Sequence, residues 1–199
     1  MSTLLSRCDT TKVEGPSSVP NYLDVEVSLD QVIPRIWRRF LLRDRATFLD
    51  LHQAIQDACG WERSHLFAFR DAKGAVIAGM PDDFGFGSPD PDAGKVRAGE
   101  YLKRNWSVAY EYDFGDSWEH TVELKEVVTE AEKFTRRILD GARAFPPEDC
   151  GGVPGYEDVV PVASGGEAAY HDTADLRAWC AGWDPDFFDL AAVGRQFDH

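Results

Sequence analysis

The stretch SVAYEYDFGDSWEHTVELK, residues 107–125, decides the fold of this chain. Apolar and polar residues alternate along 107–113 and again along 118–125, which is the pattern of strands with one face on a core. The residues between the two runs, Phe114-Gly115-Asp116-Ser117, are rich in turn formers. The stretch therefore predicts an antiparallel hairpin. Its packed face would carry Tyr110, Tyr112, Trp118, His120, Val122 and Leu124.

Strands and a helix are predicted before this hairpin. Alternation over 22–29 indicates a half-buried strand, and a second strand is expected over 36–42. A helix is expected over 48–59, because apolar residues recur there at helical spacing. Thr47 is a good N-cap for that helix, and Gly60 stands where a helix stop is expected.

The remaining segments complete an α+β pattern. We expect a hairpin of 65–70 with 75–78, a polar loop over 80–94, a helix over 129–139 with Ala131, Phe134 and Ile138 buried, and short helices near 156–162, 172–180 and 185–197. Because strands come early and helices late, the sequence predicts a single α+β domain, a mainly antiparallel sheet covered by helices. Residues 1–19 are expected to be a flexible leader and 20–199 the domain.

Composition restricts the partners of this protein. The 199 residues include 35 acidic and 21 basic side chains, a net charge of −14. This charge disfavours extended nucleic-acid binding, which depends on lysines and arginines, and it suits a basic protein partner. No run approaches the roughly 18 apolar residues of a membrane span. The first twenty residues lack the hydrophobic region of a signal peptide, so a cytoplasmic location with reduced thiols is expected.

The central hairpin holds the densest group of candidate functional side chains: Asp113, Asp116 and His120. One interpretation is structural: the aspartates hydrogen-bond turn amides, and Gly115 supplies a positive φ. The other is chemical: His120 and the carboxylates surround a metal ion or a proton-transfer site. The second interpretation needs ligands from a neighbouring element.

The loop Glu148-Asp149-Cys150-Gly151-Gly152 is the candidate neighbour, because the preceding Pro146-Pro147 and the closing glycines hold the carboxylate pair and the thiol in a stiff loop rather than a helix. It completes a candidate polar pocket, in which the metal ligands would be His120, Asp116, Glu148 and Cys150. The only cofactor suggested is a divalent metal. The simpler interpretation of Cys150 is a buried thiol.

Two further histidines, His52 and His65, are expected on inward faces and belong to the same candidate pocket. Each alone is commonly a hydrogen-bonded core residue. We nonetheless hypothesise that at least two of these side chains converge on one pocket: His52, His65, His120 and Cys150.

A basic cluster interrupts the acidic chain: Arg35, Arg38, Arg39, Arg43 and Arg45 fall within eleven positions. Alternation along 36–42 points Arg38 and Arg39 to opposite faces. One interpretation is internal pairing with carboxylates, for which arginine is well suited. The other is an anion site for a nucleotide, a phosphate or a nucleic-acid end, with Arg38 and Arg39 as candidate ligands.

Several motifs together resemble one known family. They are IPRIWRRF (33–40), LHQAIQDACGW (51–61) followed by HLFAF (65–69), YEYDFGDSWEH (110–120), ARAFPPEDCGGVPGY (142–156) and WDPDFFDL (183–190). In this order they are similar to the plasmid pRiA4b ORF-3-like family, over residues 20 to 197. The resemblance implies an α+β domain of largely uncharacterised function, found on plasmids and in bacterial and archaeal genomes. Some members carry the label of a resolvase-like passenger protein of an insertion element.

Three functions follow in order of expectation. The first is a non-catalytic binding or accessory module associated with mobile elements, with an acidic surface for a basic partner and a polar pocket for a small ligand or ion. The second is a metal-dependent hydrolase or nuclease that uses Asp113, Asp116, Glu148, Asp149 and His120 as ligands or bases, with Arg38 or Arg39 as a possible aid. The third is a resolvase-like recombination protein, although residues 140–199 hold twelve acidic and only three basic side chains.

Overall fold

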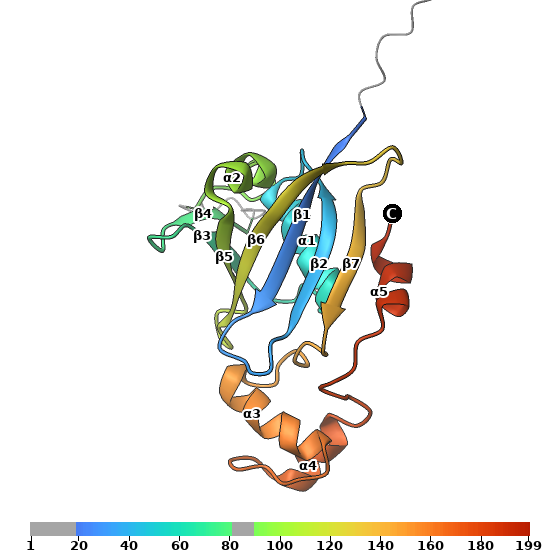
Figure 1. Cartoon of the computed structure of the whole chain (residues 1–199). Helices are drawn as coiled ribbons and strands as arrows, with labels where there is room; N and C mark the ends of the chain where they lie inside the picture. Colours follow the sequence, from blue (N-terminus) through green and yellow to red (C-terminus); the bar gives the residue numbers. More distant parts are fainter. Residues whose placement is uncertain (1–18, 81–89) are drawn as a thin grey trace, which may run out of the picture.

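The structure is a computed structural model that describes residues 19–80 and 90–199. Its strands form one sheet in the order β4-β3-β5-β6-β1-β2-β7, and all neighbouring strands are antiparallel (Figure 1). The strands are β1 (Asn21–Leu29), β2 (Trp37–Arg43), β3 (Phe67–Arg70), β4 (Val76–Gly79), β5 (Ser107–Tyr112), β6 (Trp118–Thr129) and β7 (Arg136–Ala142). The helices are α1 (Phe48–Cys59), α2 (Ala98–Asn105), α3 (Gly152–Ala163), α4 (Thr173–Trp179) and α5 (Leu190–Phe197). The predicted α+β class is confirmed.

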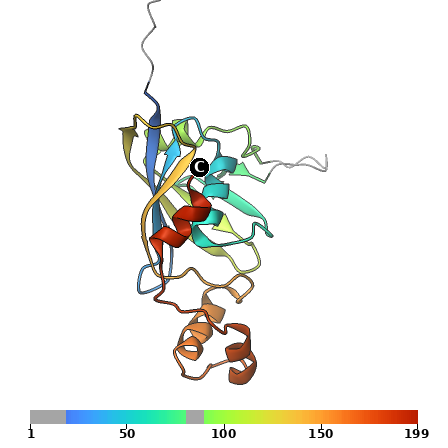
Figure 2. The same cartoon turned by 90° about the vertical axis from the view of Figure 1, so that its right-hand side faces the viewer.

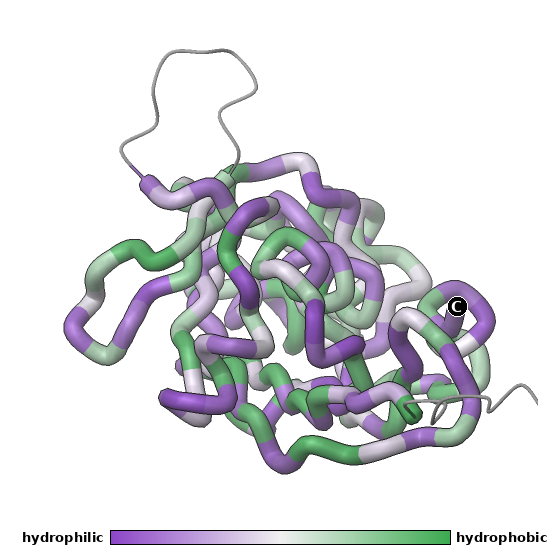
Figure 3. Tube along the Cα trace, turned by 90° about the horizontal axis from the view of Figure 1, so that it is seen from above, coloured by the Kyte–Doolittle hydropathy of each residue, from purple (hydrophilic) through white to green (hydrophobic). Residues whose placement is uncertain are grey.

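Four of the five helices form two groups, and α2 lies by itself at one end of the sheet (Figure 1). α1 and α5 lie against one face of the sheet, and α3 and α4 form a small lobe at one end of it (Figure 2). We call the end of the sheet beside α3 the lobe end, and the opposite end, beside α2, the distal end (Figure 1). Seen from above, hydrophilic and hydrophobic residues alternate along much of the chain (Figure 3).

Helix α1 forms as its sequence predicts. Thr47 and Asp50 make a capping box, in which each side chain accepts from the other residue's backbone N–H. Gly60 ends the helix in the left-handed conformation, with φ of 81°. Leu51 and Ile55 are completely buried, so this helix supplies the core beneath the sheet.

The central hairpin is also confirmed. β5 pairs with β6 so that Tyr110 faces His120 and Tyr112 faces Trp118. All six side chains predicted on its packed face are buried. The hairpin therefore delivers its connecting turn, residues 113–117, to the lobe end of the sheet (Figure 1).

Strand β1 differs from the prediction, because it is buried on both faces rather than on one. Asp24 is only 3% exposed and Glu26 only 8%. Arg39 on the neighbouring strand binds Asp24 through two hydrogen bonds, of 2.7 and 2.6 Å, and covers it. In a central strand, long side chains from the neighbouring strands cover the polar residues and shield them from solvent. The alternation of polar and apolar residues does not show this burial.

The helix predicted over 129–139 is wrong, because that segment ends β6 and begins β7. Phe134 and Ile138 are buried as expected, but Ala131 is exposed. Pairing of β7 with β2 overrides the helical spacing of these apolar residues. In addition, α2 was not predicted, and α5 begins at Leu190 rather than at 185.

Two sequence expectations concern segments that are only partly described. The predicted polar loop 80–94 includes residues 81–89, and the predicted leader includes residues 1–18; both of these stretches lie outside the described residues. Within the described ranges, no helix has the length and apolar character needed to cross a membrane.

Candidate functional site

Three loops meet at the lobe end of the sheet: residues 61–66 after α1, the turn 113–117, and the loop 143–151 before α3. Asp113 N donates to Leu66 O at 2.9 Å, which joins the first two loops. Gly151 N donates to Asp116 Oδ2 at 3.1 Å, which joins the second and third. The central turn and the loop 148–150, predicted as possible neighbours, therefore lie in contact.

A histidine and two aspartates form the polar centre of this junction. His65 Nε2 lies 3.0 Å from Asp149 Oδ1, and His65 Nδ1 lies 3.6 Å from Asp113 Oδ2. One ligand atom from each of His65, Asp113 and Asp149 lies within 4.8 Å of the others. We call these three residues the HDD cluster. Imidazole nitrogen and carboxylate oxygen are the ligands that zinc and similar divalent ions take in proteins.

The backbone of both aspartates is in the left-handed region, with φ of 55° at Asp113 and 59° at Asp149. Asp113 Oδ1 accepts from Gly115 N at 2.9 Å, so its role in the turn is the predicted one. The predicted positive φ of Gly115 is wrong, because Asp113 and Ser117 take that conformation instead. The turn occupies Oδ1 of Asp113 and leaves Oδ2 on the side of His65.

Glu148 is held on the inner side of the same junction. Its Oε1 accepts a hydrogen bond from the Tyr112 hydroxyl, and its Oε2 accepts one from Glu62 N at 2.9 Å. Burial and this bond to Glu148 raise the pKa of Tyr112 well above its usual value. Both oxygens of Glu148 are therefore engaged, and Glu148 ties β5 to the loop rather than facing the HDD cluster.

Cys150 has the properties of a protonated thiol. Burial, with the charge of Asp116 as a smaller cause, raises its pKa to about 12. Its Sγ donates a long hydrogen bond of 3.9 Å to Gly152 O. The thiol, rather than the thiolate, is therefore the form of Cys150 at neutral pH.

His52 and His120 meet in the aromatic core rather than at the loops. His52 Nδ1 lies 2.8 Å from the Tyr110 hydroxyl oxygen, and His120 Nδ1 lies 3.3 Å from the Tyr110 carbonyl oxygen. Burial lowers the pKa of His52 to about 3 and that of His120 to about 4. Both imidazoles are therefore neutral, and His120 Nε2 has no hydrogen-bond partner among the described residues.

Arg38 and Arg39 point to opposite faces, as predicted. Arg39 pairs with Asp24. Arg38, only 4% exposed, forms no ion pair with a described residue. It instead donates to three carbonyl oxygens, of Ala58, Trp37 and Ala142, and stacks between the rings of Phe145 and Phe188. Burial lowers the pKa of Arg38 to about 10.

A cavity of about 280 Å³ lies beside the stacked Arg38. Its walls combine aromatic rings with the loop that carries Glu148, and the residues that matter here are Arg38, Trp61, Phe145, Glu148, Trp183 and Phe188. The indole Nε1 of Trp61 donates to Pro146 O at 2.8 Å, which holds this wall in place. The cavity and the HDD cluster thus share the loop 143–151.

The four residues expected to bind metal do not come together as a ligand set. His120 is in the core, Glu148 is doubly hydrogen-bonded, Cys150 Sγ donates to Gly152 O, and Asp116 bonds to Gly151. Among the described residues, the group with metal-ligand proximity is His65, Asp113 and Asp149. All three were candidate pocket residues. Spacing along the chain could not show that Asp113 and Asp149, rather than Asp116 and Glu148, lie beside His65, because the fold of the loops decides which carboxylate faces that histidine.

Comparison with known proteins agrees with the motif resemblance. Residues 21–192 match the family described as plasmid pRiA4b ORF-3-like protein. The chain is 31% identical over 170 residues to the uncharacterized protein y4hQ of Sinorhizobium fredii (strain NBRC 101917 / NGR234), a match that covers 84% of this chain and 85% of the relative. The crystal structure of a protein of unknown function, MM3350 from Methanosarcina mazei Go1, superposes with a TM-score of 0.74 at 32% identity, covering 87% of this chain and 97% of that chain.

Proposed function

We propose that this chain, which belongs to the plasmid pRiA4b ORF-3-like family, is a non-catalytic binding module that holds a divalent cation at the HDD cluster. The proximity of one imidazole and two carboxylates carries the proposal. A shared positive ion would offset the repulsion between the two carboxylates that approach the His65 ring. The nitrogen ligand favours Zn²⁺ or Mn²⁺ over Ca²⁺, which prefers oxygen.

The geometry around the cluster supports binding more than catalysis. Glu148, in the loop that also carries Asp149, has both oxygens bonded, to the Tyr112 hydroxyl and to Glu62 N, so it is not available as a general base. The adjoining cavity beside Arg38 offers room for a small ligand or a side chain of a partner.

Ion titration tests this function. Untagged full-length protein, freed of metal with a chelator, would be titrated with Zn²⁺ and with Mn²⁺ by calorimetry. We expect one ion per chain, and affinity lowered about tenfold or more in Asp113→Asn and in Asp149→Asn. Asparagine accepts turn hydrogen bonds and tolerates a positive φ, so these variants should fold.

Asp71→Asn is the matched control. Asp71 also caps a turn, accepting from Lys73 N at 2.8 Å and Ala75 N at 2.9 Å, but it is not in the cluster. Unchanged affinity in Asp71→Asn together with weakened binding in the other two variants supports the proposal. Equal affinity in all four proteins, or no binding of either ion, contradicts it.

A metal-dependent hydrolase is the second candidate, and one observation favours it. Three protein ligands leave coordination positions open to water, which is the arrangement of catalytic zinc sites. Asp149 is 73% exposed at its side chain, so this side is open to solvent. Metal-loaded protein that hydrolyses a phosphodiester such as bis(p-nitrophenyl) phosphate, with turnover lost in Asp113→Asn, would make the protein an enzyme.

The cytoplasm of the host cell is the proposed location, because the three cysteines in the described residues are free, which suits a reducing compartment.

A basic protein is the proposed partner. Residues 140–199, which include the lobe, hold twelve acidic and three basic side chains. We expect a basic peptide to bind with an affinity that falls as salt rises, and the exposed lobe variant Glu157→Lys/Glu167→Lys to weaken that binding at least tenfold. Gel shifts with DNA that survive physiological salt would instead favour the recombination role.

A further inference from the structure

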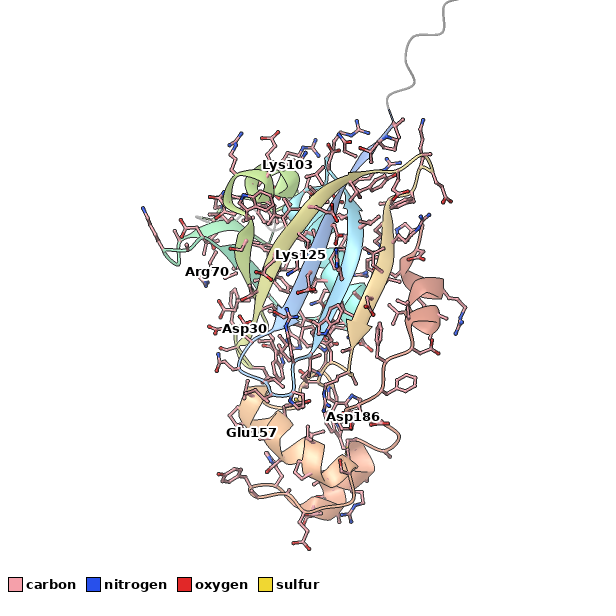
Figure 4. The ribbon with its side chains drawn as sticks, viewed as in Figure 1. Asp30, Arg70, Lys103, Lys125, Glu157 and Asp186 are labelled. Carbon is pink, nitrogen blue, oxygen red and sulfur yellow. The ribbon has the colours of Figure 1, made fainter. Side chains whose placement is uncertain are left out.

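The distal end of the sheet carries a concentration of positive charge in an acidic protein. Arg43 ends β2, Arg45 follows it in the turn, Arg97 precedes α2, and Lys133 lies between β6 and β7. Figure 4 shows Lys103 at this end too, whereas Glu157 and Asp186 lie at the lobe end. The net charge of −14 is therefore unevenly distributed along the molecule.

These cations differ from most others in lacking a carboxylate partner. Of the nineteen lysines and arginines in the described residues, eleven form an ion pair. The eight that do not are Arg38, Arg43, Arg45, Lys73, Arg97, Lys133, Arg177 and Arg195. Half of these eight lie together at the distal end. In a protein with excess carboxylates, unpaired cations gathered in one place create a local positive potential that attracts an anion.

The four side chains surround two cavities. Arg43, Arg45 and Arg97 line one of about 270 Å³. Arg43 and Arg45 also line a second, of about 540 Å³, together with Lys133. Because Arg43 and Arg45 belong to both, the cavities share a wall.

Hydrogen bonds hold two of the arginines in place while leaving donors available. Arg43 Nε donates to Phe134 O at 2.7 Å, and Arg97 Nη1 donates to Arg45 O at 2.6 Å. The remaining guanidinium nitrogens of Arg43 and Arg97, and all those of Arg45, have no hydrogen-bond acceptor among the described residues. Guanidinium groups fixed through one nitrogen are suited to bind phosphate oxygens with the others.

The carboxylates that line these cavities are already bound. Asp44 Oδ2 lies 3.3 Å from Lys103 Nζ. Asp50 Oδ2 accepts from Thr47 N at 2.7 Å and from Thr47 Oγ1 at 2.8 Å. With Lys103 offsetting Asp44, the four unpaired cations exceed the local negative charge.

We propose that the distal end is a binding site for a compact phosphate-bearing anion, held by Arg43, Arg45, Arg97 and Lys133. Two or more phosphate groups suit four cations spread over two joined cavities. A duplex is not the ligand, because its backbone would extend past the cluster along a protein of net charge −14. The site is separate from the HDD cluster at the opposite end and does not depend on it.

Pyrophosphate binding measured by calorimetry tests the site, with EDTA present so that no divalent ion bridges protein and ligand. We expect one pyrophosphate per chain, with affinity lowered at least tenfold in the double variant Arg45→Ala/Arg97→Ala. Arg45 and Arg97 are exposed, so the variant should fold, which circular dichroism checks. The control is Arg177→Ala/Arg195→Ala, which removes two unpaired arginines from elsewhere and gives the same net charge.

The outcomes are distinct. Loss of affinity only in the distal variant supports the site, whereas equal loss in both variants shows a general charge effect and overturns it. Failure of wild-type protein to bind pyrophosphate also overturns it. A ten-nucleotide single strand with and without a 5′-phosphate identifies the source of the phosphate: stronger binding of the phosphorylated strand indicates a nucleic-acid end, and equal weak binding indicates a small polyphosphate.

Discussion

His52 Nδ1 lies 2.8 Å from the hydroxyl oxygen of Tyr110, inside the core between α1 and β5. Gln56 Nε2 donates to the same hydroxyl at 3.0 Å, so the Tyr110 proton is directed to His52. The imidazole also stacks on Phe67, with ring centroids 3.7 Å apart. A neutral His52 is therefore part of the folded core, and its protonation would remove the acceptor that Tyr110 needs.

Acid should unfold this protein through His52 and His120. In the folded protein their pKa values are about 3 and about 4, below the ordinary 6.5. Between pH 6.5 and pH 4, the unfolded chain therefore binds more protons than the folded chain. The contribution of the two neutral histidines to the free energy of unfolding is fully present above pH 6.5. It falls as the pH drops below that value, by about 2 kcal/mol per histidine at pH 5. Urea unfolding at pH 8 and pH 5 measures the fall.

His120→Leu should reduce that fall by about 2 kcal/mol, because it removes one buried titrating group. His199→Gln, which changes an exposed imidazole at the chain end, is the control. A pH dependence that is the same in wild type and His120→Leu would contradict the assignment.

Bound metal should stabilise the folded protein. At an ion concentration one hundred times the dissociation constant, the gain is about 2.7 kcal/mol, because the ligand set is assembled only in the folded chain. Thermal unfolding with and without Zn²⁺ measures it, and Asp149→Asn should lose most of the gain. A gain that persists in Asp149→Asn would place the ion elsewhere.

The capping box of α1 should contribute about 1 kcal/mol. Thr47→Ala removes the side-chain acceptor for Asp50 N, whereas Thr47→Ser keeps it. The urea midpoint should fall in the alanine variant and stay near wild type in the serine variant. Equal losses in the two variants would show that the Thr47 methyl group, not the hydrogen bond, stabilises this end.

Gly155 should not tolerate a side chain. A Cβ there would lie 1.7 Å from Cys150 O, so Gly155→Ala must displace α3 or the loop that carries Asp149. We expect a loss of about 3 kcal/mol or more and weaker ion binding. Gly194→Ala in α5 is the matched control, because its nearest neighbours lie at 3.5 Å and alanine favours helices. Similar stability of the two variants would contradict the close approach.

Helix α1, whose sequence pattern lies within one segment, was predicted correctly, whereas β7, which depends on pairing with a distant strand, was not. α1 was predicted correctly because Thr47, its apolar spacing and Gly60 all act within one segment. The helix over 129–139 failed because Phe134 and Ile138 fit a helical stripe in sequence, whereas in the structure Phe134 precedes β7 and packs with Tyr22, and Ile138 lies in the main core. Pairing of β7 with β2 decided against the helix.

The sequence by itself determined the hairpin, the first helix and the opposite orientation of Arg38 and Arg39, since each follows from the periodicity of neighbouring residues. Only the tertiary structure decided which charges are paired. It brought His65 beside Asp113 and Asp149 from three separate loops, placed Arg39 on Asp24, and left Arg43, Arg45 and Arg97 without a carboxylate among the described residues. The physical reason is that an ion pair depends on distances of a few ångströms across elements, and packing of the whole sheet sets those distances.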